Sequence, residues 1–355
     1  MLRLESRSTQ SFAAAWLSPL MALVLKVITG GVIFLAMGKD PSTALYIYFV
    51  EPLTTTSGLS EVAVKAGPLI LIGIGLSFGF RAGIWNIGAE GQYIAGAIAG
   101  GGLAVFFYES ESTLLLPAML ELGTLGGMAW AAVPALLKTR FNANEILVSL
   151  MLVYVAELLL VHLVQGPWRN PQGWGFPGTR LFPDAATMPL LFSGKRVHLG
   201  TLITLAVPFI AWFILARTRF GFTVRVFGSA PLAARHAGVH GHRMIWQSLL
   251  IGGGLAGLAG VIEATSTIGQ LVPNISPGYG FTAIIVAFLG RLHPLGVLLA
   301  GIAIAVTYIG GEGAQISAGL PKAVTSLFQG IILFYLLAFD LFTRYRIIVS
   351  SRATE

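Results

Sequence analysis

Long apolar segments recur along the whole chain and constrain its fold more than any other feature. A helix needs about 20 mostly apolar residues to cross the hydrocarbon core of a bilayer. Candidate segments cover, roughly, residues 17–37, 61–80, 87–107, 114–137, 145–165, 199–217, 244–264, 275–290, 294–311 and 321–342. The sequence therefore predicts an all-α polytopic integral membrane protein, with about ten transmembrane helices in a single domain over residues 1–355.

The composition supports a membrane protein and excludes several other classes. Of the 355 residues, 55% are apolar and only 10% are charged, whereas soluble domains carry about 25% charged residues. The 44 glycines suit close helix packing in lipid. Because the chain has no cysteine, it can form no disulfide, thiolate metal site or thiol nucleophile. We assign the net charge of +7 to basic cytoplasmic loops rather than to nucleic-acid binding.

The placement of lysine and arginine gives the orientation of the chain in the membrane. Arg3 and Arg7 precede the first apolar segment, which is long enough to be a retained helix rather than a cleaved signal. With both termini cytoplasmic, 14 basic residues fall on the inner side and 7 on the outer side, as the positive-inside rule expects. This topology makes 166–198 a long external loop and 217–243 a cytoplasmic loop, and it places the short apolar stretch 41–53 at the outer surface.

One polar, glycine-containing stretch interrupts the apolar pattern between two predicted helices. It runs from Phe80 to Gln92 and reads F-R-A-G-I-W-N-I-G-A-E-G-Q. Polar side chains and irregular backbone occur at membrane depth only where protein or a water-filled cavity surrounds them. The third predicted helix opens inside this stretch and the eighth is short, so we expect one or two of the helices to be broken or re-entrant.

The side chains of this stretch are candidates for lining a substrate pathway. A tryptophan face can stack on a planar ring, and amide groups can donate to and accept from a polar solute. A carboxylate is favoured near the start of a helix. The same residues can instead cap and pin a broken helix, and the sequence leaves both possibilities open. The candidate pathway residues are Phe80, Trp85, Asn86, Glu90 and Gln92.

The cytoplasmic loop contains a second candidate element. Ser229 is a plausible N-cap, Pro231 fits the first turn, and a short helix over Leu232–Ala237 would end at Gly238. A short helix projecting on the cytoplasmic side suits the docking of another protein. The alternative is an ordinary basic inner loop. A third segment, Ala287 to Gly296, holds Arg291 and His293, and the histidine is expected to be a structural hydrogen-bonding residue.

Several catalytic motifs are absent from the sequence. It contains no G-x-x-x-x-G-K-[ST] phosphate-binding loop, no H-E-x-x-H and no G-x-S-x-G. A stand-alone secondary transporter is a rival interpretation, although no pair of intramembrane acid and base stands out for ion coupling. An intramembrane enzyme is a further rival, and it would need a catalytic pair that the sequence does not contain.

Three segments in matching order resemble one family of membrane proteins. Residues 78–92, 228–238 and 287–296 resemble permease subunits of bacterial ABC importers of the nucleoside and simple-sugar type, in the branched-chain amino acid and ribose permease superfamily. The run G-S-A-P-L-A-A-R-H-A-G resembles the pattern G-x-N-P-x-A-A-x-x-A-G, but Ala230 stands where the family has an asparagine. The resemblance implies a coupling helix for an ATPase, with candidate residues Gly228, Ser229, Pro231, Ala233, Ala234, Arg235 and Gly238.

The resemblance also implies a transport subunit rather than an enzyme. It implies a multi-pass protein of the bacterial inner membrane that moves its substrate by alternating access. No cofactor is expected in the chain, because ATP and Mg²⁺ would bind to a partner ATPase. Expected partners are a second homologous permease, ABC ATPase subunits, an external solute-binding protein and membrane lipid, but no nucleic acid. The N-I-G-A-E-G-Q form favours nucleosides as substrates, and simple sugars are the alternative.

Overall fold

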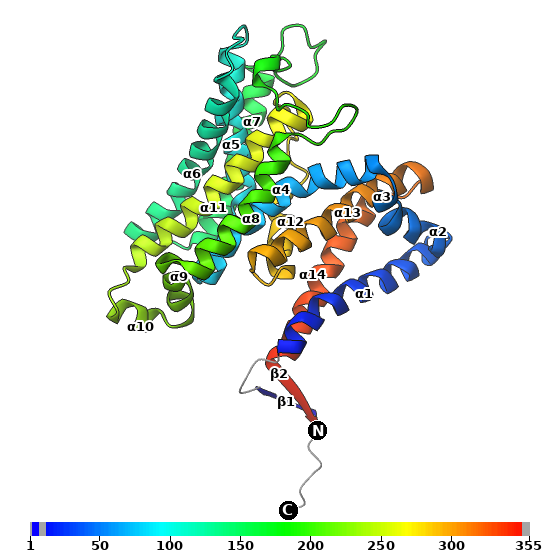
Figure 1. The fold of residues 1–355 in the computed structure, drawn as a ribbon, viewed down its shortest axis with the longest axis vertical. Helices are drawn as coiled ribbons and strands as arrows, with labels where there is room; N and C mark the ends of the chain where they lie inside the picture. The colour runs from blue at the N-terminus through cyan, green and yellow to red at the C-terminus, as the bar shows by residue number, and fades with distance from the viewer. Residues whose placement is uncertain (1, 7–11, 350–355) are drawn as a thin grey trace, which may run out of the picture. The chain divides into compact units, whose positions relative to one another are not determined.

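The computed structural model describes residues 2–6 and 12–349, and a helix occupies each of the ten apolar segments (Figure 1). Arg7 lies outside the described residues. The ten helices are α1 (Phe12–Ala36), α4 (Thr56–Arg81), α5 (Ala89–Phe106), α6 (Leu115–Phe141), α7 (Glu145–Gln165), α8 (Leu199–Arg217), α11 (Gly241–Glu263), α12 (Tyr279–Leu289), α13 (Pro294–Ala318) and α14 (Ala323–Arg344).

Shorter elements join these helices. The stretch expected at the outer surface forms α2 (Pro41–Leu45), the π-helical turn η1 (Tyr46–Val50) and α3 (Glu51–Thr54). The loop 166–198 contains only a short 3₁₀ turn, η2 (Asp184–Ala186), and an isolated bridge between Leu190 and His198. The loop predicted to be cytoplasmic contains α9 (Arg219–Ser229) and α10 (Pro231–His236), and α11 continues into the π-helical turn η3 (Ala264–Ile268).

Six helices in the described part of the chain are long and apolar enough to cross a membrane, fewer than the ten expected. They are α4, α6, α7, α8, α11 with η3, and α13. The apolar helix α12 has only 11 residues, and α5 opens with Glu90 and Gln92 and is buried along most of its length. For α1 and α14, the apolar parts with described side chains are Met21–Ala36 and Ala323–Tyr335.

A two-stranded sheet departs from the all-helical prediction. Strand β1 (Leu2–Ser6) pairs antiparallel with β2 (Tyr345–Val349), and Leu4 lies opposite Ile347. The hydrophobic pattern gave no sign of this sheet, because segments near the two ends of the chain form it and each strand has only five residues.

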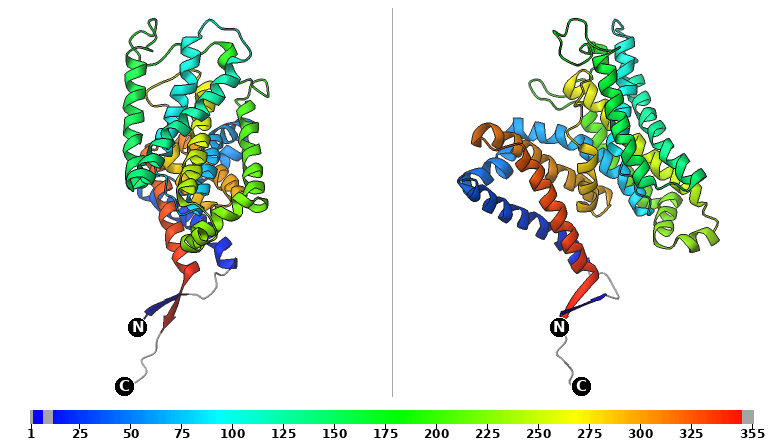
Figure 2. Two further views of the ribbon diagram at one scale, coloured as in Figure 1. Left: turned by 90° about the vertical axis from the view of Figure 1, so that its left-hand side faces the viewer. Right: turned by 180° about the vertical axis from the view of Figure 1, so that it is seen from behind.

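The described chain divides into two compact units, Met1–Leu59 with Val306–Glu355, and Ser60–Ala305. In the second unit, α5 packs against α6, α7, α11 and α12, and α5, α6, α7 and α11 run side by side in Figure 2. Glycines allow the closest approaches, since a Cβ at Gly96 would overlap the backbone of Gly257, and one at Gly127 would overlap that of Gly253. Backbones in contact at small residues are the usual packing of helices in lipid.

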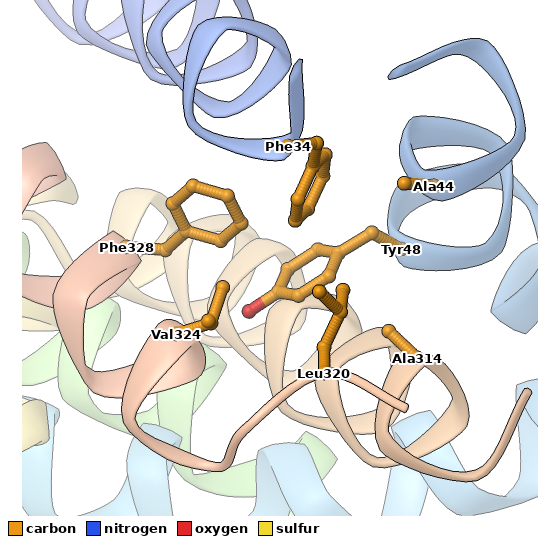
Figure 3. Packing of buried hydrophobic residues seen from close by; sticks show 7 residues of the cluster. All are labelled: Phe34, Ala44, Tyr48, Ala314, Leu320, Val324 and Phe328. Carbon is orange, nitrogen blue, oxygen red and sulfur yellow. The ribbon is translucent and has the colours of Figure 1, made fainter. Parts of the chain in front are cut away.

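The first unit has its own aromatic core, which joins α1, η1 and α14 (Figure 3). The ring of Phe328 meets those of Phe34 and Tyr48 edge-on, with centroids 5.4 and 4.8 Å apart. Lys26, whose side chain is buried on α1, donates to the Thr307 hydroxyl at 2.8 Å, and its ammonium lies 5.5 Å from the Phe49 ring. A buried lysine next to a hydroxyl and a ring keeps one hydrogen bond and a cation–π contact in place of water.

Candidate functional site

The helix break expected between Phe80 and Gln92 is present. Helix α4 ends at Arg81, and α5 begins at Ala89. Gly83 adopts a left-handed conformation, with φ of +72°, and the amide of Ile84 donates back to the carbonyl of Gly79 at 2.9 Å. Glycine reaches positive φ without the strain of a side chain. The turn at Gly83 therefore ends α4, and residues 84–88, which form neither helix nor strand, connect it to α5.

Asn86 and Gln92 close this break by bonding to each other. The Asn86 amide nitrogen donates to Gln92 Oε1 at 2.8 Å, and the Gln92 amide nitrogen donates to Asn86 Oδ1 at 3.1 Å. The same Asn86 oxygen accepts from the amide of Gly88 at 3.1 Å. Asn86 is 3% exposed and Gln92 is 1% exposed. Because buried amides must be paired, this pair fixes the shape of the segment.

Glu90 binds the beginning of α12, 190 residues further along the chain. Its Oε2 accepts a hydrogen bond from the amide of Gly280, and the Ser276 hydroxyl also contacts the carboxylate. A Cβ at Gly280 would overlap the Glu90 backbone, so glycine is required there. A carboxylate is favoured at a helix N-terminus, where amides are unpaired and the dipole is positive. The broken helix α5 thus holds the short helix α12.

An aromatic cluster lies where α4 ends. The ring centroids of Phe80 and Trp85 are 5.0 Å apart, those of Phe80 and Phe288 are 5.3 Å apart, and those of Trp85 and Phe288 are 5.9 Å apart. Of the candidate pathway residues, only Trp85 is substantially exposed, at 40%, and Phe80 is 8% exposed. Trp85 therefore keeps a free surface while its ring packs on two phenylalanines. We call Phe80, Trp85 and Phe288 the aromatic cluster.

Sequence analysis did not identify Phe288. The nearest signal in the sequence was a weak similarity of Gly79-Phe80-Arg81 to the later stretch Gly290-Arg291-Leu292-His293-Pro294-Leu295-Gly296, which begins two residues after Phe288. The structure brings these two segments together, because Arg81 Nε donates to the Leu292 carbonyl at 2.9 Å. Arg291 and Leu292 both adopt positive φ, at 56° and 55°, and such tight turns aim the carbonyl of Leu292 at Arg81.

His293 follows this turn. Its burial, and to a smaller extent the charge of Arg81, lower the pKa of His293. A lowered pKa favours the neutral imidazole, as expected of a structural residue.

Other polar side chains lie buried inside the same unit. The rings of Tyr93 and Tyr279 are 6.0 Å apart, and the Lys65 ammonium lies 5.8 Å from the Tyr279 ring. Glu263 is 6% exposed and lies in the electrostatic field of Lys65 and Arg196. The Tyr93 hydroxyl is buried without a hydrogen-bond partner among the described residues. These groups give α4, α5, α11 and α12 a polar interior.

The candidate coupling residues fall on α9, α10 and the turn after α10. Pro231 starts α10 as expected, Ala234 is fully buried, and Gly238 follows the helix with φ of +84°. Ala233 and Arg235 are exposed. The N-cap assignment of Ser229 is wrong, because the unexpected helix α9 runs through Ser229 and its hydroxyl bonds back to the Val226 carbonyl at 3.3 Å. Ala230 holds the N-cap position of α10 without a side-chain bond.

Gly228 joins the coupling segment to the broken helix. A Cβ at Gly228 would overlap the carbonyl oxygen of Arg81. Phe78, about one turn before Arg81 on α4, and Phe220, about two turns before Gly228 on α9, stack with ring centroids 6.2 Å apart. Helix α9 therefore packs directly on the end of α4, next to the aromatic cluster.

Within residues 2–6 and 12–349, no three His, Cys, Asp or Glu side chains are grouped to hold a metal ion. Glu90 bonds to the beginning of α12, Arg81 bonds to the Leu292 carbonyl, and Lys65 lies beside the Tyr279 ring. The geometry suits the guidance of a polar solute past an aromatic surface and the transmission of movement between helices.

Comparisons with known proteins give one consistent result. The model of the family described as "Branched-chain amino acid transport system / permease component" matches residues 58–337. A glucose ABC transporter permease protein, TsgB13 of Haloferax volcanii, is 37% identical over 98% of this chain and 93% of its own length. The guanosine permease NupP of Bacillus subtilis is 29% identical over 90% and 92%. The nucleoside permease NupB of Lactococcus lactis is 26% identical over 90% of both chains.

Proposed function

The chain belongs to the permease family of branched-chain amino acid transport systems, and from this premise we propose that it is the membrane-spanning subunit of an ABC importer for simple sugars. It is a multi-pass membrane protein and a transport subunit of the sugar and nucleoside type, without a catalytic domain or a cofactor of its own. ATP is hydrolysed on partner ATPase subunits, as the family implies.

The similarity to the glucose permease supports a sugar substrate. That match extends over 98% of the chain at 37% identity, whereas the guanosine and nucleoside permeases are 29% and 26% identical. Our first expectation from the N-I-G-A-E-G-Q form was a nucleoside, and the matches favour the sugar alternative over it. Nucleosides remain the second candidate, because two relatives named for nucleoside transport also match over 90% of the chain.

We assign different roles to the candidate pathway residues. Trp85 offers the exposed aromatic face, on which the apolar face of a sugar or the plane of a base can stack. Phe80 packs against that ring and holds it in place. Asn86 and Gln92 are buried and bonded to each other, and Glu90 is bonded to α12. These three residues set the position of the tryptophan and of the helix break.

The partners follow from the same proposal. A second permease of this family completes the pathway, and a permease pair is consistent with a second Haloferax volcanii relative, named as a glucose ABC transporter permease and 29% identical. An external solute-binding protein delivers the substrate to the loop 166–198, and ATPase subunits bind α9 and α10. We place both termini on the cytoplasmic side, in accordance with the basic residues of α9 and α10.

Uptake by the reconstituted transporter tests the function. Proteoliposomes that hold this chain with its partner permease, ATPase and binding protein are given radiolabelled glucose, with ATP on the ATPase side. We expect uptake that requires ATP and is competed by unlabelled simple sugars but not by guanosine. Competition by guanosine alone would move the substrate to nucleosides and keep the importer. Uptake without ATP or the partner chains would refute the importer and favour a secondary transporter.

A further inference from the structure

An apolar groove lies on the second unit, and its lining includes none of the three residues of the aromatic cluster. It has a volume of about 600 Å³ and lies between α4, α6, α8 and α11. All four helices are long and apolar enough to span the membrane. Its walls include Val207 and Ile214 of α8, Phe220 of α9 and Leu250 of α11, and its floor includes Gly254. The groove therefore opens at membrane depth.

The lining suits a hydrocarbon chain and not water. Thr124 and Gln247 are the polar residues of the lining, and the Thr124 hydroxyl already donates to the Leu120 carbonyl at 2.8 Å. An ordered water needs two to four polar partners, and apolar cavities that lack them stay dry. The volume lies in the range of small-molecule binding sites. A flexible acyl chain from the surrounding bilayer has the chemistry to fill this groove.

Basic side chains lie beyond one end of the groove. Arg217 comes three residues after Ile214 on α8, and Arg243 comes four residues before Gln247 on α11. Residues three or four apart lie on the same face of a helix, so both arginines continue the groove toward the end where α9 and α10 connect α8 to α11. Both are exposed, and neither makes a salt bridge within residues 2–6 and 12–349.

We propose that this groove is a binding site for one anionic phospholipid of the cytoplasmic leaflet. The acyl chain fills the groove, and the negatively charged headgroup pairs with Arg217 and Arg243. Arginine forms bidentate hydrogen bonds with phosphate. The apolar lining of the groove therefore matches the acyl chain, and the two arginines match the phosphate headgroup. The proposal does not depend on which solute the transporter carries.

Lipid titration of the assembled transporter tests the site. The purified complex is delipidated and titrated with palmitoyl-oleoyl phosphatidylglycerol or phosphatidylcholine, and bound lipid is counted by native mass spectrometry. We expect one tightly bound phosphatidylglycerol per copy of this chain. Val207→Trp should abolish it by filling the groove. The matched control Leu205→Trp, at an exposed position of α8 outside the groove, should leave it unchanged.

The headgroup is tested separately. A double variant, Arg217→Gln with Arg243→Gln, should weaken phosphatidylglycerol binding roughly tenfold or more, because each basic residue at an anionic membrane surface contributes about a factor of five. Arg169→Gln in the external loop should have no effect. The proposal is wrong if phosphatidylcholine binds equally well, or if Val207→Trp keeps the lipid while retaining the melting temperature of the parent. It is also wrong if the isolated chain binds lipid but the assembled transporter does not, since the second permease would then cover the groove.

Discussion

The backbone of Gly228 packs against the carbonyl oxygen of Arg81, so closely that a Cβ at Gly228 would overlap that oxygen. Arg81 also donates from its guanidinium to the carbonyl of Leu292. The end of α4 is therefore in contact with α9 on one side and with the turn before α13 on the other. If ATPase subunits act on α9 and α10, movement of α9 is passed through this junction to the end of α4, which carries Phe80 of the aromatic cluster.

Gly228→Ala should weaken this junction. The added methyl group meets backbone rather than a flexible side chain, so α9 has to move away from α4, and overpacking of this kind costs about 1–3 kcal/mol. We expect the ATPase to bind normally while substrate-dependent uptake falls about tenfold. ATPase co-purification and uptake in proteoliposomes measure the two effects separately.

Gly241→Ala is the matched control for this change. Gly241 lies in the same segment, 217–243, but a Cβ there would make ordinary contacts of 3.6 Å with the Phe227 ring. Uptake by the Gly241→Ala transporter should equal that of the parent. Equal losses in the two variants would show that the junction at Arg81 has no special role.

Leu232→Ser should weaken binding of the ATPase. Leu232 is 72% exposed on α10, and an exposed leucine on a short cytoplasmic helix is a natural anchor for a partner. We expect the yield of co-purified ATPase to fall at least tenfold, with no change in the melting temperature of the chain. Ala237→Ser, at an exposed position just after α10, should leave the yield unchanged, and full ATPase recovery with Leu232→Ser would refute docking at α10.

The Asn86–Gln92 pair should behave as a coupled unit in stability measurements. Asn86→Leu leaves the Gln92 amide buried without its partner, and an unpaired buried polar group costs about 1–3 kcal/mol. Gln92→Met should lower the free energy of unfolding by a similar amount. Because the double variant leaves neither amide unpaired, we expect its loss to be smaller than the sum by about 0.5–3 kcal/mol. Thermal unfolding in detergent measures the cycle, and simple additivity would contradict the paired geometry.

Trp85→Ala should impair transport without unfolding the protein. The tryptophan is 40% exposed, and aromatic stacking on a solute ring contributes about 1–3 kcal/mol, so uptake should fall about tenfold. Trp85→Phe keeps an aromatic face and should retain most of the uptake. Trp174→Ala, which removes a tryptophan that is 96% exposed in the external loop, is the control. Normal uptake kinetics with Trp85→Ala would remove this residue from the pathway.

The positions of the long helices were predictable from the sequence, because bilayer thickness sets the length of each apolar segment. The breaks before α5 and at the short helix α12 were also predictable, since glycines and polar residues interrupted the pattern there. Helix α9 was not predictable, because the segment 217–243, with its five arginines and several glycines, has the composition of a loop. The assignment of Ser229 as a cap failed for the same reason, as α9 extends through it.

The contacts of the candidate site lay beyond sequence reasoning. Glu90 was recognised as a residue near a helix start, but its partner Gly280 is 190 positions away. Phe288 resembled any apolar residue of a span until the fold placed it on Phe80. A helical pattern shows which face of a helix is apolar, but it does not show which other helix covers that face.

His198 gives the final prediction, a loss of stability in acid. This histidine precedes α8 and is 4% exposed, and both ring nitrogens lack hydrogen-bond partners among the described residues. Burial, together with the charge of Arg196, lowers its pKa from 6.5 to about 4. The folded state therefore holds the neutral ring, while the unfolded chain takes up a proton as the pH falls below 6.5. Stability should be complete above that pH and decline down to pH 4, by at most about 3 kcal/mol.

Melting temperatures between pH 7.5 and pH 4.5 measure this loss. Part of the decline with pH should disappear in His198→Asn, because that side chain does not titrate. His242→Gln, which replaces an exposed histidine at the start of α11, should keep the decline of the parent. His198 lies opposite Leu190 in a bridge whose hydrogen bonds run from the Leu191 amide to the Val197 carbonyl and from the Leu199 amide to the Pro189 carbonyl. The transition should therefore appear first as increased proteolysis of the loop 166–198. Parallel pH profiles for the parent and His198→Asn would show that burial of this ring does not govern acid stability.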